Sequence, residues 1–290
     1  MLARALTMIS LTAAAGCRPD KPAPSSDQQS GAPAADTASS GRAEEAVVTV
    51  TASDFAFQAP SEIPSRLTTF RLVNRGPSLH HIQLIKLGEG KTADDFFAAL
   101  KGGGPFPRWA TMAGGPNPPE SGATTNATLL MEAGNYVMLC FVPAADGVPH
   151  VMKGMAAPLT VSQASVPSRA EPRADVVMKL VDFDFQLSQP LTAGRHTIRI
   201  ENAGSQPHEV AIVRMKPGKS PQDFAKWGLK PIGPAPGTLF GGVSGIVPGA
   251  HAFVDVDLPA GEYALICFVP DAKDGKPHFV HGMAKLIKVG

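Results

Sequence analysis

Apolar residues gather in short stretches along this chain, and Val, Ile, Thr and Phe are the residues that most often fill them. Turn-forming residues separate the stretches, as they do between β-strands. We expect six strands in the first half of the chain, near residues 47–53, 67–73, 81–87, 127–131, 135–141 and 156–161. We expect six more in the second half, near residues 175–181, 195–201, 208–215, 251–258, 262–268 and 284–289.

One helix is predicted to interrupt each set of strands. Thr92 and Ser220 stand where an N-cap residue is expected, and Pro221 suits the first helical turn. The buried face of the first helix is predicted to consist of Phe96, Phe97 and Leu100.

The second half of the chain repeats the first. Five short motifs return in the same order, at an offset of 128 residues, or 127 near the cysteines. They are Asp-Phe-x-Phe-Gln from residues 54 and 182, Asn-x-Gly from 74 and 202, Gly-x-Tyr from 134 and 261, Cys-Phe-Val-Pro from 140 and 267, and Gly-Met from 154 and 282. The repeat predicts two domains, residues 46–163 and 174–290, joined by a linker over residues 164–173. The 29 Gly and 28 Pro residues suit an all-β chain of two tandem β-sandwiches, each with one short helical excursion.

The first 45 residues differ from the rest. Arg4 precedes a short apolar run over residues 5–15, and Gly16 then leads to Cys17. Such a run has the form of a signal peptide, and its end resembles a bacterial lipobox. We therefore expect residues 1–17 to be a lipoprotein-type signal peptide whose Cys17 is lipidated, and the alternative is simple secretion with Cys17 incidental. Residues 18–45, rich in Pro, Ala, Ser and Gly, are expected to form a disordered tether to the periplasmic side of a bacterial membrane.

Composition argues against several classes of function. The 26 basic and 25 acidic residues give no electrostatic reason to bind nucleic acid or an anionic surface. No stretch of about 18 uninterrupted apolar residues occurs, so we expect no helix of the mature part to span a membrane. No nucleophile elbow and no phosphate-binding glycine loop is present in the sequence.

Each half carries His, Cys, His and Met in the same order. The candidate metal ligands are His80, Cys140, His150 and Met155 in the first half, and His208, Cys267, His278 and Met283 in the second. Thiolate, thioether and imidazole suit copper, whereas calcium and magnesium require oxygen ligands and zinc more often takes further Cys or carboxylate ligands. Taken singly, each of these residues is more often a core residue than a ligand. Their recurrence in both halves favours a copper site, and the alignment with the second half favours the first of the two adjacent histidines at 80 and 81.

These motifs resemble those of the cupredoxin family of blue type 1 copper proteins. The resemblance covers nearly all of residues 46–290 and implies an antiparallel, Greek-key β-sandwich in each half. It also implies one mononuclear copper per domain, held by the two His and the Cys with the Met as axial ligand, and a role in one-electron transfer. The segment between Cys140 and His150 departs from the family, because it has nine residues, ten in the second half, where familiar members have far fewer. Asp-Gly turns at 146 and 274 would either return the His to the metal or leave it exposed.

Two further interpretations concern the cysteines and tyrosines. A disulfide between Cys140 and Cys267 is the alternative to two metal sites, but equivalent strand positions of separate domains would not ordinarily come within about 7 Å of each other. Tyr136 and Tyr263 are predicted to be structural, each with an inward ring and a hydroxyl group bonded to a neighbouring loop.

The sequence favours a carrier over an enzyme. Two-domain relatives of cupredoxins with catalytic copper have a His beside the ligand Cys, but Leu139 and Phe141 flank Cys140 here, and no His-x-His pair occurs. We expect an exported electron-transfer protein that meets a redox partner protein. The alternatives are copper storage, delivery or resistance, with a copper donor or acceptor as partner, and a metal-free interaction module of the cell envelope.

Overall fold

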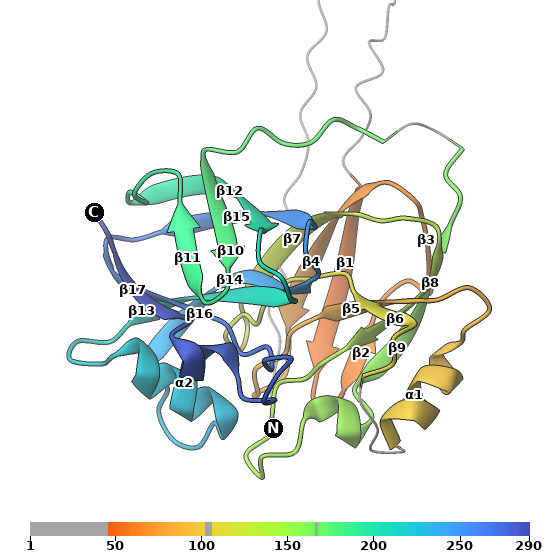
Figure 1. Ribbon diagram of the computed structural model, residues 1–290, viewed down its shortest axis with the longest axis horizontal. Coiled ribbons are helices and arrows are strands. Elements are labelled where there is room, and N and C mark those ends of the chain that lie inside the picture. Colours follow the sequence, from red (N-terminus) through yellow and green to blue (C-terminus); the bar gives the residue numbers. More distant parts are fainter. Residues whose placement is uncertain (1–45, 102–105, 166–167) are drawn as a thin grey trace, which may run out of the picture. The chain divides into compact units, whose positions relative to one another are not determined.

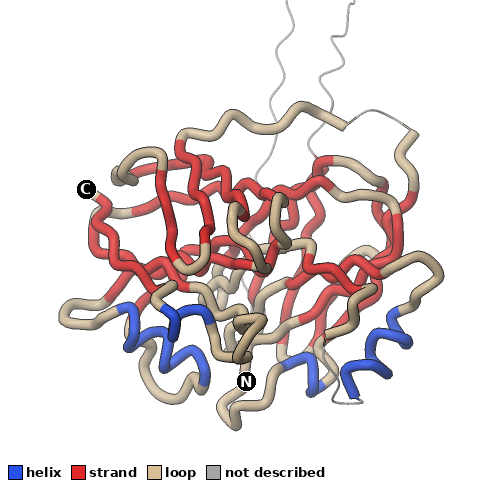
Figure 2. The backbone as a smooth tube through the Cα atoms, in the orientation of Figure 1, coloured by secondary structure: helices blue, strands red, loops and turns tan. Residues whose placement is uncertain are grey.

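The protein is described by a computed structural model that covers residues 46–101, 106–165 and 168–290. The predicted signal peptide, the tether and the lipidation site Cys17 lie outside the described residues. Strands are the main regular secondary structure in Figure 2, and helices are short interruptions. Among the described residues, no helix has the length and apolar character needed to cross a membrane.

Within the described residues, the first half forms nine strands, one α-helix and one 3-10 turn. They are β1 (Ala46–Ser53), β2 (Ala56–Gln58), β3 (Glu62–Pro64), β4 (Leu67–Asn74), β5 (Gln83–Leu87), α1 (Ala93–Lys101), β6 (Ala110–Met112), β7 (Thr124–Leu130), β8 (Gly134–Leu139), η1 (His150–Lys153) and β9 (Ala156–Ser162). All six strands predicted for this half are present. The three short strands β2, β3 and β6 were not predicted.

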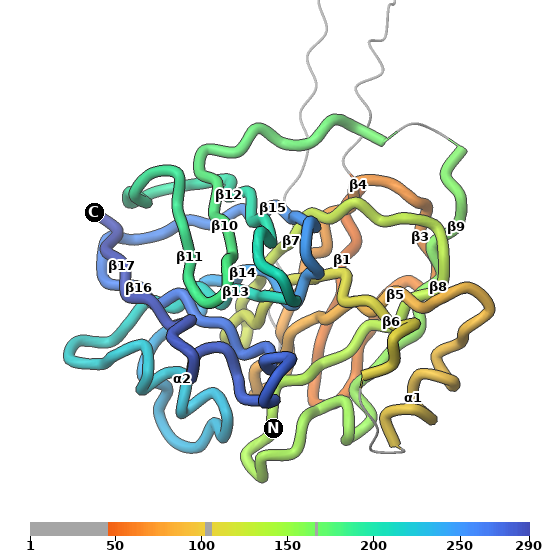
Figure 3. The backbone as a smooth tube through the Cα atoms, in the orientation of Figure 1, coloured from red at the N-terminus to blue at the C-terminus, as the bar shows by residue number. Residues whose placement is uncertain are grey.

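Within the described residues, the second half has the same order of elements as the first, except that β3 has no counterpart (Figure 3). Its elements are β10 (Val176–Val181), β11 (Asp184–Leu187), β12 (Gly194–Asn202), β13 (His208–Met215), α2 (Pro221–Leu229), β14 (Gly237–Ile246), β15 (His251–Leu258), β16 (Gly261–Ile266), η2 (His278–His281) and β17 (Ala284–Val289). The prediction missed β11 and β14. Strand β14 contains four glycines, of which Gly241 and Gly242 have positive φ, so its composition is that of a loop.

The strands form three sheets (Figure 1). One sheet, in the order β3-β9-β8-β5-β6, belongs to the first half, and another, in the order β14-β13-β16-β17, belongs to the second. The third sheet has the order β11-β10-β12-β15-β7-β4-β1-β2 and takes strands from both halves. Most pairs are antiparallel, as predicted, but β1 with β4, β10 with β12, and β3 with β9 are parallel.

Both helices begin where the sequence predicts. The Ser220 hydroxyl accepts from the backbone N–H of Asp223, whose carboxylate accepts from the N–H of Ser220, so α2 starts with a reciprocal cap. Thr92 and Asp95 make the same pair of bonds before α1. Of the three residues predicted for the buried face of α1, Phe96 is fully buried, and Phe97 and Leu100 are half-buried.

Buried polar contacts join the two halves. Strand β7 pairs with β15, and the Asn126 side chain exchanges two hydrogen bonds with the backbone of Asp255. Asn117, which is 2% exposed, donates from Nδ2 to the carbonyls of Val210 and Val243 at 2.7 and 3.1 Å. The halves are therefore held together by specific backbone recognition as well as by apolar packing.

Replacing Asn117 by Ala should destabilise the whole protein. The change leaves the buried carbonyls of Val210 and Val243 without this donor, and an unsatisfied buried polar group costs about 1–3 kcal/mol. We expect a loss of about 2 kcal/mol in the free energy of unfolding measured with urea. Asn126→Ala at the more exposed contact is the comparison and should lose less, and an equal or larger loss there would contradict the interpretation of Asn117.

Candidate metal centres

A loop that is held in place by side-chain hydrogen bonds positions the first histidine of each group. The Asn74 side chain, at the end of β4, accepts from the backbone N–H of Gly76 and donates to the carbonyl of Ser78, so it fixes the path that leads to His80. Asn202 makes the equivalent bonds before His208. The repeated Asn-x-Gly motif thus positions the ligand loop.

The glycine of that motif leaves room for a hydrogen-bonded histidine–aspartate pair. A Cβ added to Gly76 would lie 2.7 Å from Asp54 Oδ1 and 2.8 Å from His80 Nε2, closer than real Cβ contacts. The carboxylate and the imidazole are themselves 2.8 Å apart. Only a residue without a side chain fits against this pair.

Replacing Gly76 by Ala should therefore cost about 2 kcal/mol of stability, because overpacking of a filled site costs about 1–3 kcal/mol. Urea unfolding measures the loss. In a variant that already carries Asp54→Ala, the carboxylate that would crowd the added methyl group is absent. Gly76→Ala should therefore lower the free energy of unfolding less in that variant. An equal cost in both backgrounds would show that the crowding lies elsewhere.

The long segment between Cys and the second His folds outward and returns. Asp146 and Gly147 form the predicted turn, with Gly147 at φ 82° and Asp146 Oδ1 accepting from the N–H of Val148. The two ends of the segment meet, because the N–H of His150 donates to Val142 O and that of Val151 to Cys140 O. The same bonds close the second half, from His278 to Val269 O and from Phe279 to Cys267 O. The extra residues therefore do not separate the second His from the Cys.

In the first half, three ligand atoms from distant parts of the chain meet. His80 Nδ1 lies 3.1 Å from His150 Nδ1, and His150 Nδ1 lies 3.5 Å from Cys140 Sγ. All three atoms lie within 4.8 Å of one another, and all three side chains are fully buried. His81 is not part of this group, because its Nε2 accepts from the N–H of Phe141.

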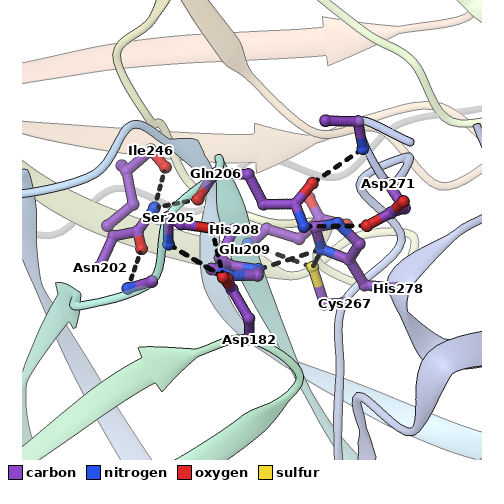
Figure 4. Close-up of polar contacts among 12 residues, drawn as sticks. Asp182, Asn202, Ser205, Gln206, His208, Glu209, Ile246, Cys267, Asp271 and His278 are labelled. Atoms are coloured by element: carbon purple, nitrogen blue, oxygen red, sulfur yellow. Dashed lines mark hydrogen bonds and ion pairs between the residues drawn. The ribbon is translucent and has the colours of Figure 1, made fainter.

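The second half has the same arrangement (Figure 4). His208 Nδ1 lies 3.0 Å from His278 Nδ1, which lies 3.4 Å from Cys267 Sγ. His208 Nε2 is 2.5 Å from Asp182 Oδ1. The three side chains again have no exposed surface.

The methionines adjoin these groups through the backbone. The N–H of Cys140 donates to Met155 O, and the N–H of Cys267 to Met283 O. Both methionines are fully buried in the same apolar cluster as the two cysteines. Both cysteines are free, so the alternative of a disulfide between them does not hold.

Aromatic rings pack against the second imidazole of each group. Phe55 lies edge-on to His150, with ring centroids 5.0 Å apart, and Phe183 lies 5.1 Å from His278. Among the described residues, the Nε2 atoms of both imidazoles are buried without a hydrogen-bond partner. Burial lowers the pKa of His150 and of His278 to about 4, so both rings are neutral at neutral pH.

Each cysteine sulfur is a buried thiol in the metal-free protein. Burial raises the pKa of Cys140 to about 12 and that of Cys267 well above its usual range. Backbone N–H groups of His81 and Val142 point to the first sulfur, and those of Glu209 and Val269 to the second. Cys140 and Cys267 would hold a metal ion as thiolates, and the two N–H groups would stabilise that charged form of each sulfur.

The donor set fits a single copper ion. His80 Nε2 donates to Asp54, so its Nδ1 keeps a lone pair that faces His150 Nδ1 and Cys140 Sγ. Two imidazole nitrogens about 2 Å from an ion in a trigonal plane lie roughly 3.5 Å apart, close to the separation found here. A carboxylate behind a ligating imidazole fixes the ring and its tautomer, as Asp54 and Asp182 do.

Sequence reasoning missed these carboxylates, although it identified their motif. Asp54 and Asp182 open the repeated Asp-Phe motif, which was interpreted only as evidence of the repeat. The phenylalanine beside each aspartate is the ring that packs against the second imidazole. The sequence did offer one signal for them: an acidic residue followed by an aromatic residue recurs in both halves, far from the ligands in sequence.

A third group of ligand-type atoms in the second half comes from the buried Asp271 and the exposed Asp274 and His281. His281 Nε2 is 3.2 Å from Asp274 Oδ1. In the first half, Lys153 and Asp146 form an ion pair at the equivalent positions, 2.6 Å apart. The histidine–aspartate contact thus corresponds to an ordinary surface ion pair.

The tyrosines behave as predicted. Both rings are buried, and their hydroxyl groups donate to Glu132 O and Pro259 O from Tyr136 and Tyr263. Each half therefore consists of packed β-sheets with a tyrosine whose hydroxyl group bonds back to a nearby loop. Each half also carries His, Cys, His and Met in the same chain order. Both halves have a cupredoxin fold.

Comparison of the cupredoxin-like chain with solved structures gives matches of low identity. The dithionite-reduced auracyanin from Roseiflexus castenholzii is 23% identical, covers 41% of this chain and 98% of its own, and has a TM-score of 0.29. Auracyanin A, a blue copper protein from Chloroflexus aurantiacus, is 22% identical over 40% of this chain and 99% of its own, with a TM-score of 0.28. A blue copper oxidase from Nitrosomonas europaea is 14% identical over 85% of this chain and 86% of its own, with a TM-score of 0.25. No protein-family model and no curated protein matches the sequence.

Proposed function

We propose that this chain is an exported electron-transfer protein with one mononuclear, type 1-like copper site in each domain. One observation carries the proposal: in each half, two imidazole Nδ1 atoms and one thiol sulfur meet within 4.8 Å, fully buried. His80, Cys140 and His150 would hold the first ion, with Met155 as axial ligand. His208, Cys267, His278 and Met283 would hold the second.

The surrounding residues suit a carrier of single electrons. A bound copper ion supplies a one-electron couple between Cu(II) and Cu(I). Asp54 and Asp182 orient the first imidazoles, and the Phe rings and the apolar core exclude water from the ligands. Because the ligands come from braced loops and buried positions, both oxidation states would meet nearly the same ligand geometry.

The proposal includes no catalytic copper. Cys140 has Leu139 and Phe141 as neighbours, and Cys267 has Ile266 and Phe268, so no histidine adjoins either cysteine. Within the part of the chain that the structure describes, the remaining group of ligand-type atoms is the third group, which has a single histidine. The residues therefore support transfer of electrons to and from partner proteins rather than conversion of a substrate.

Copper storage, delivery or resistance is the second candidate. Met152 lies in η1, between His150 and Met155, and its side chain is 57% exposed. An exposed thioether beside a buried copper ligand is a suitable first contact for Cu(I). This candidate predicts tight binding of Cu(I) without an intense colour in the oxidised protein.

The location and partners belong to the proposal as well. Cys17 would carry lipid on the periplasmic side of a bacterial membrane, and residues 18–45 would tether the domains. A Cys17→Ala variant that stays membrane-bound after export would contradict this. The partner would be a redox protein, or a copper donor or acceptor if the second candidate is right.

Reconstitution with copper tests the function. We expect the Cu(II) form to show an intense visible thiolate band that a mild reductant bleaches and air restores over repeated cycles. Tight Cu(I) binding without the band would favour copper handling. No binding of either ion by folded protein would contradict both and leave a metal-free interaction module.

A further inference from the structure

The two candidate copper sites share their inner groups. Each has the same three ligand atoms from two His and one Cys, the same carboxylate behind the first imidazole, and two backbone N–H groups pointing to the sulfur. A difference in reduction potential between the two sites would therefore arise from the charges around these shared groups.

The first difference lies directly after the first histidine. In the first half, the N–H of Phe141 donates to His81 Nε2 at 2.9 Å, and in the second half the N–H of Phe268 donates to Glu209 Oε1 at 2.9 Å. His81 and Glu209 are each 7% exposed. The same buried bond is thus made to an imidazole in one domain and to a carboxylate in the other.

The carboxylate near the second imidazole differs in burial between the halves: the buried Asp271 acts on His278, whereas the exposed Asp146 acts on His150. Asp271 is 5% exposed, and its Oδ2 accepts from Gln206 Nε2 at 2.9 Å. Figure 4 shows Asp271 close to His278, and the Asp271 charge acts to raise the pKa of His278. Ala144 occupies the equivalent position in the first half.

The cations near the two sites also differ. Lys153 Nζ lies 5.5 Å from the ring centre of Phe55, which packs on His150. His281 takes the place of this lysine in the second half and lies against Phe183. Each half also has one lysine–aspartate ion pair here, Lys153 with Asp146 and Lys276 with Asp274, so the charges of these two lysines do not distinguish the sites.

We propose that the copper site of the second domain has the lower reduction potential, so that a singly reduced chain holds its electron in the first domain. This inference rests on the proposed function. Negative charge stabilises Cu(II) more than Cu(I), and a unit charge about 10 Å away at an effective dielectric constant of 20 shifts an equilibrium by more than tenfold. The paired sites are then a directional unit, in which the second domain is the stronger donor.

Spectroelectrochemical titration of the copper-loaded full chain at pH 8.5 tests the inference. Cys140→Ser leaves only the second site and Cys267→Ser only the first, which assigns each potential to a domain. We expect the second site to be lower by at least 59 mV, the equivalent of a tenfold change in the Cu(II)/Cu(I) ratio for one electron.

Isosteric substitutions separate charge from packing. Glu209→Gln keeps an Oε1 acceptor for Phe268 and removes the negative charge, and should raise the second potential while leaving the first unchanged. His81→Gln, which exchanges one neutral acceptor for another, is the matched control and should shift the first potential little.

Equal potentials in the two domains, the reverse order, or a second potential that Glu209→Gln leaves unchanged would overturn the inference while leaving the copper sites in place. Failure of the wild-type protein to form a thiolate band would instead remove the proposed function, and the inference with it. The band in each single-site variant therefore distinguishes the two failures.

Discussion

Replacing Cys140 by Ser should reduce the copper bound by each chain from two ions to one and should remove about half of the visible thiolate absorption. The hydroxyl group is a hard, weakly acidic donor that cannot take the place of the thiolate in a copper site. The two remaining imidazoles would hold Cu(II) far more weakly and Cu(I) hardly at all. Metal analysis after gel filtration, together with the absorption spectrum, measures both losses.

Cys267→Ser is the matched variant, because Cys267 has the same environment in the other half. It should produce the same loss, and the double variant should bind no copper tightly. Circular dichroism of each variant shows whether the fold is kept. Two tightly bound ions in the double variant would mean that copper binds elsewhere and that the candidate centres are not metal sites.

The metal-free protein should lose stability as pH falls from about 6.5 to about 4. Burial holds the pKa of His81, His150 and His278 at about 4, so the folded state resists protons that the unfolded chain takes up below about 6.5. The contribution of these three imidazoles to the free energy of unfolding is complete above pH 6.5 and is lost as the pH falls through about 4. Each imidazole accounts for up to about 3 kcal/mol of the free energy of unfolding.

Glu209 works in the opposite direction. Burial raises its pKa from the ordinary value of 4.5 to about 7. Its contribution to the free energy of unfolding is therefore complete below about pH 4.5 and is lost as the pH rises through 7. It offsets part of the acid-induced loss, and Glu209→Gln should make the loss steeper while stabilising the protein at pH 8. Urea unfolding in the presence of a chelator at pH 7.5 and pH 4.5 measures the difference, and equal stability at the two pH values would contradict the assignment.

The repeat and the order of ligand types were strong enough to predict most strands, both helix starts and the members of each metal group. Each ligand is a distinctive residue, and a second copy tests each assignment independently. The prediction favoured His80 over His81 because only His80 has a histidine counterpart in the second half. In the structure His80 lies beside Cys140 and His150, whereas His81 accepts a hydrogen bond from Phe141.

What the sequence could not show depends on contacts between distant segments. The pairing of β14 with β13 follows from backbone recognition around glycines, and Gly242 allows the backbone to approach Val210 more closely than a side chain would permit. The closure of the long Cys–His segment likewise depends on backbone hydrogen bonds such as that from His150 N–H to Val142 O. Such bonds cannot be predicted from the residue types. For the same reason, the carboxylate partners Asp54 and Asp182 emerged only from the fold.

X-ray absorption spectroscopy of the copper-loaded protein tests the central claim most directly. We predict two copper ions per chain, each with one short sulfur ligand and two imidazole nitrogen ligands. Cys140→Ser and Cys267→Ser should each bind one copper ion, which keeps its short sulfur ligand. A copper environment made only of nitrogen and oxygen ligands in folded wild-type protein would contradict the account.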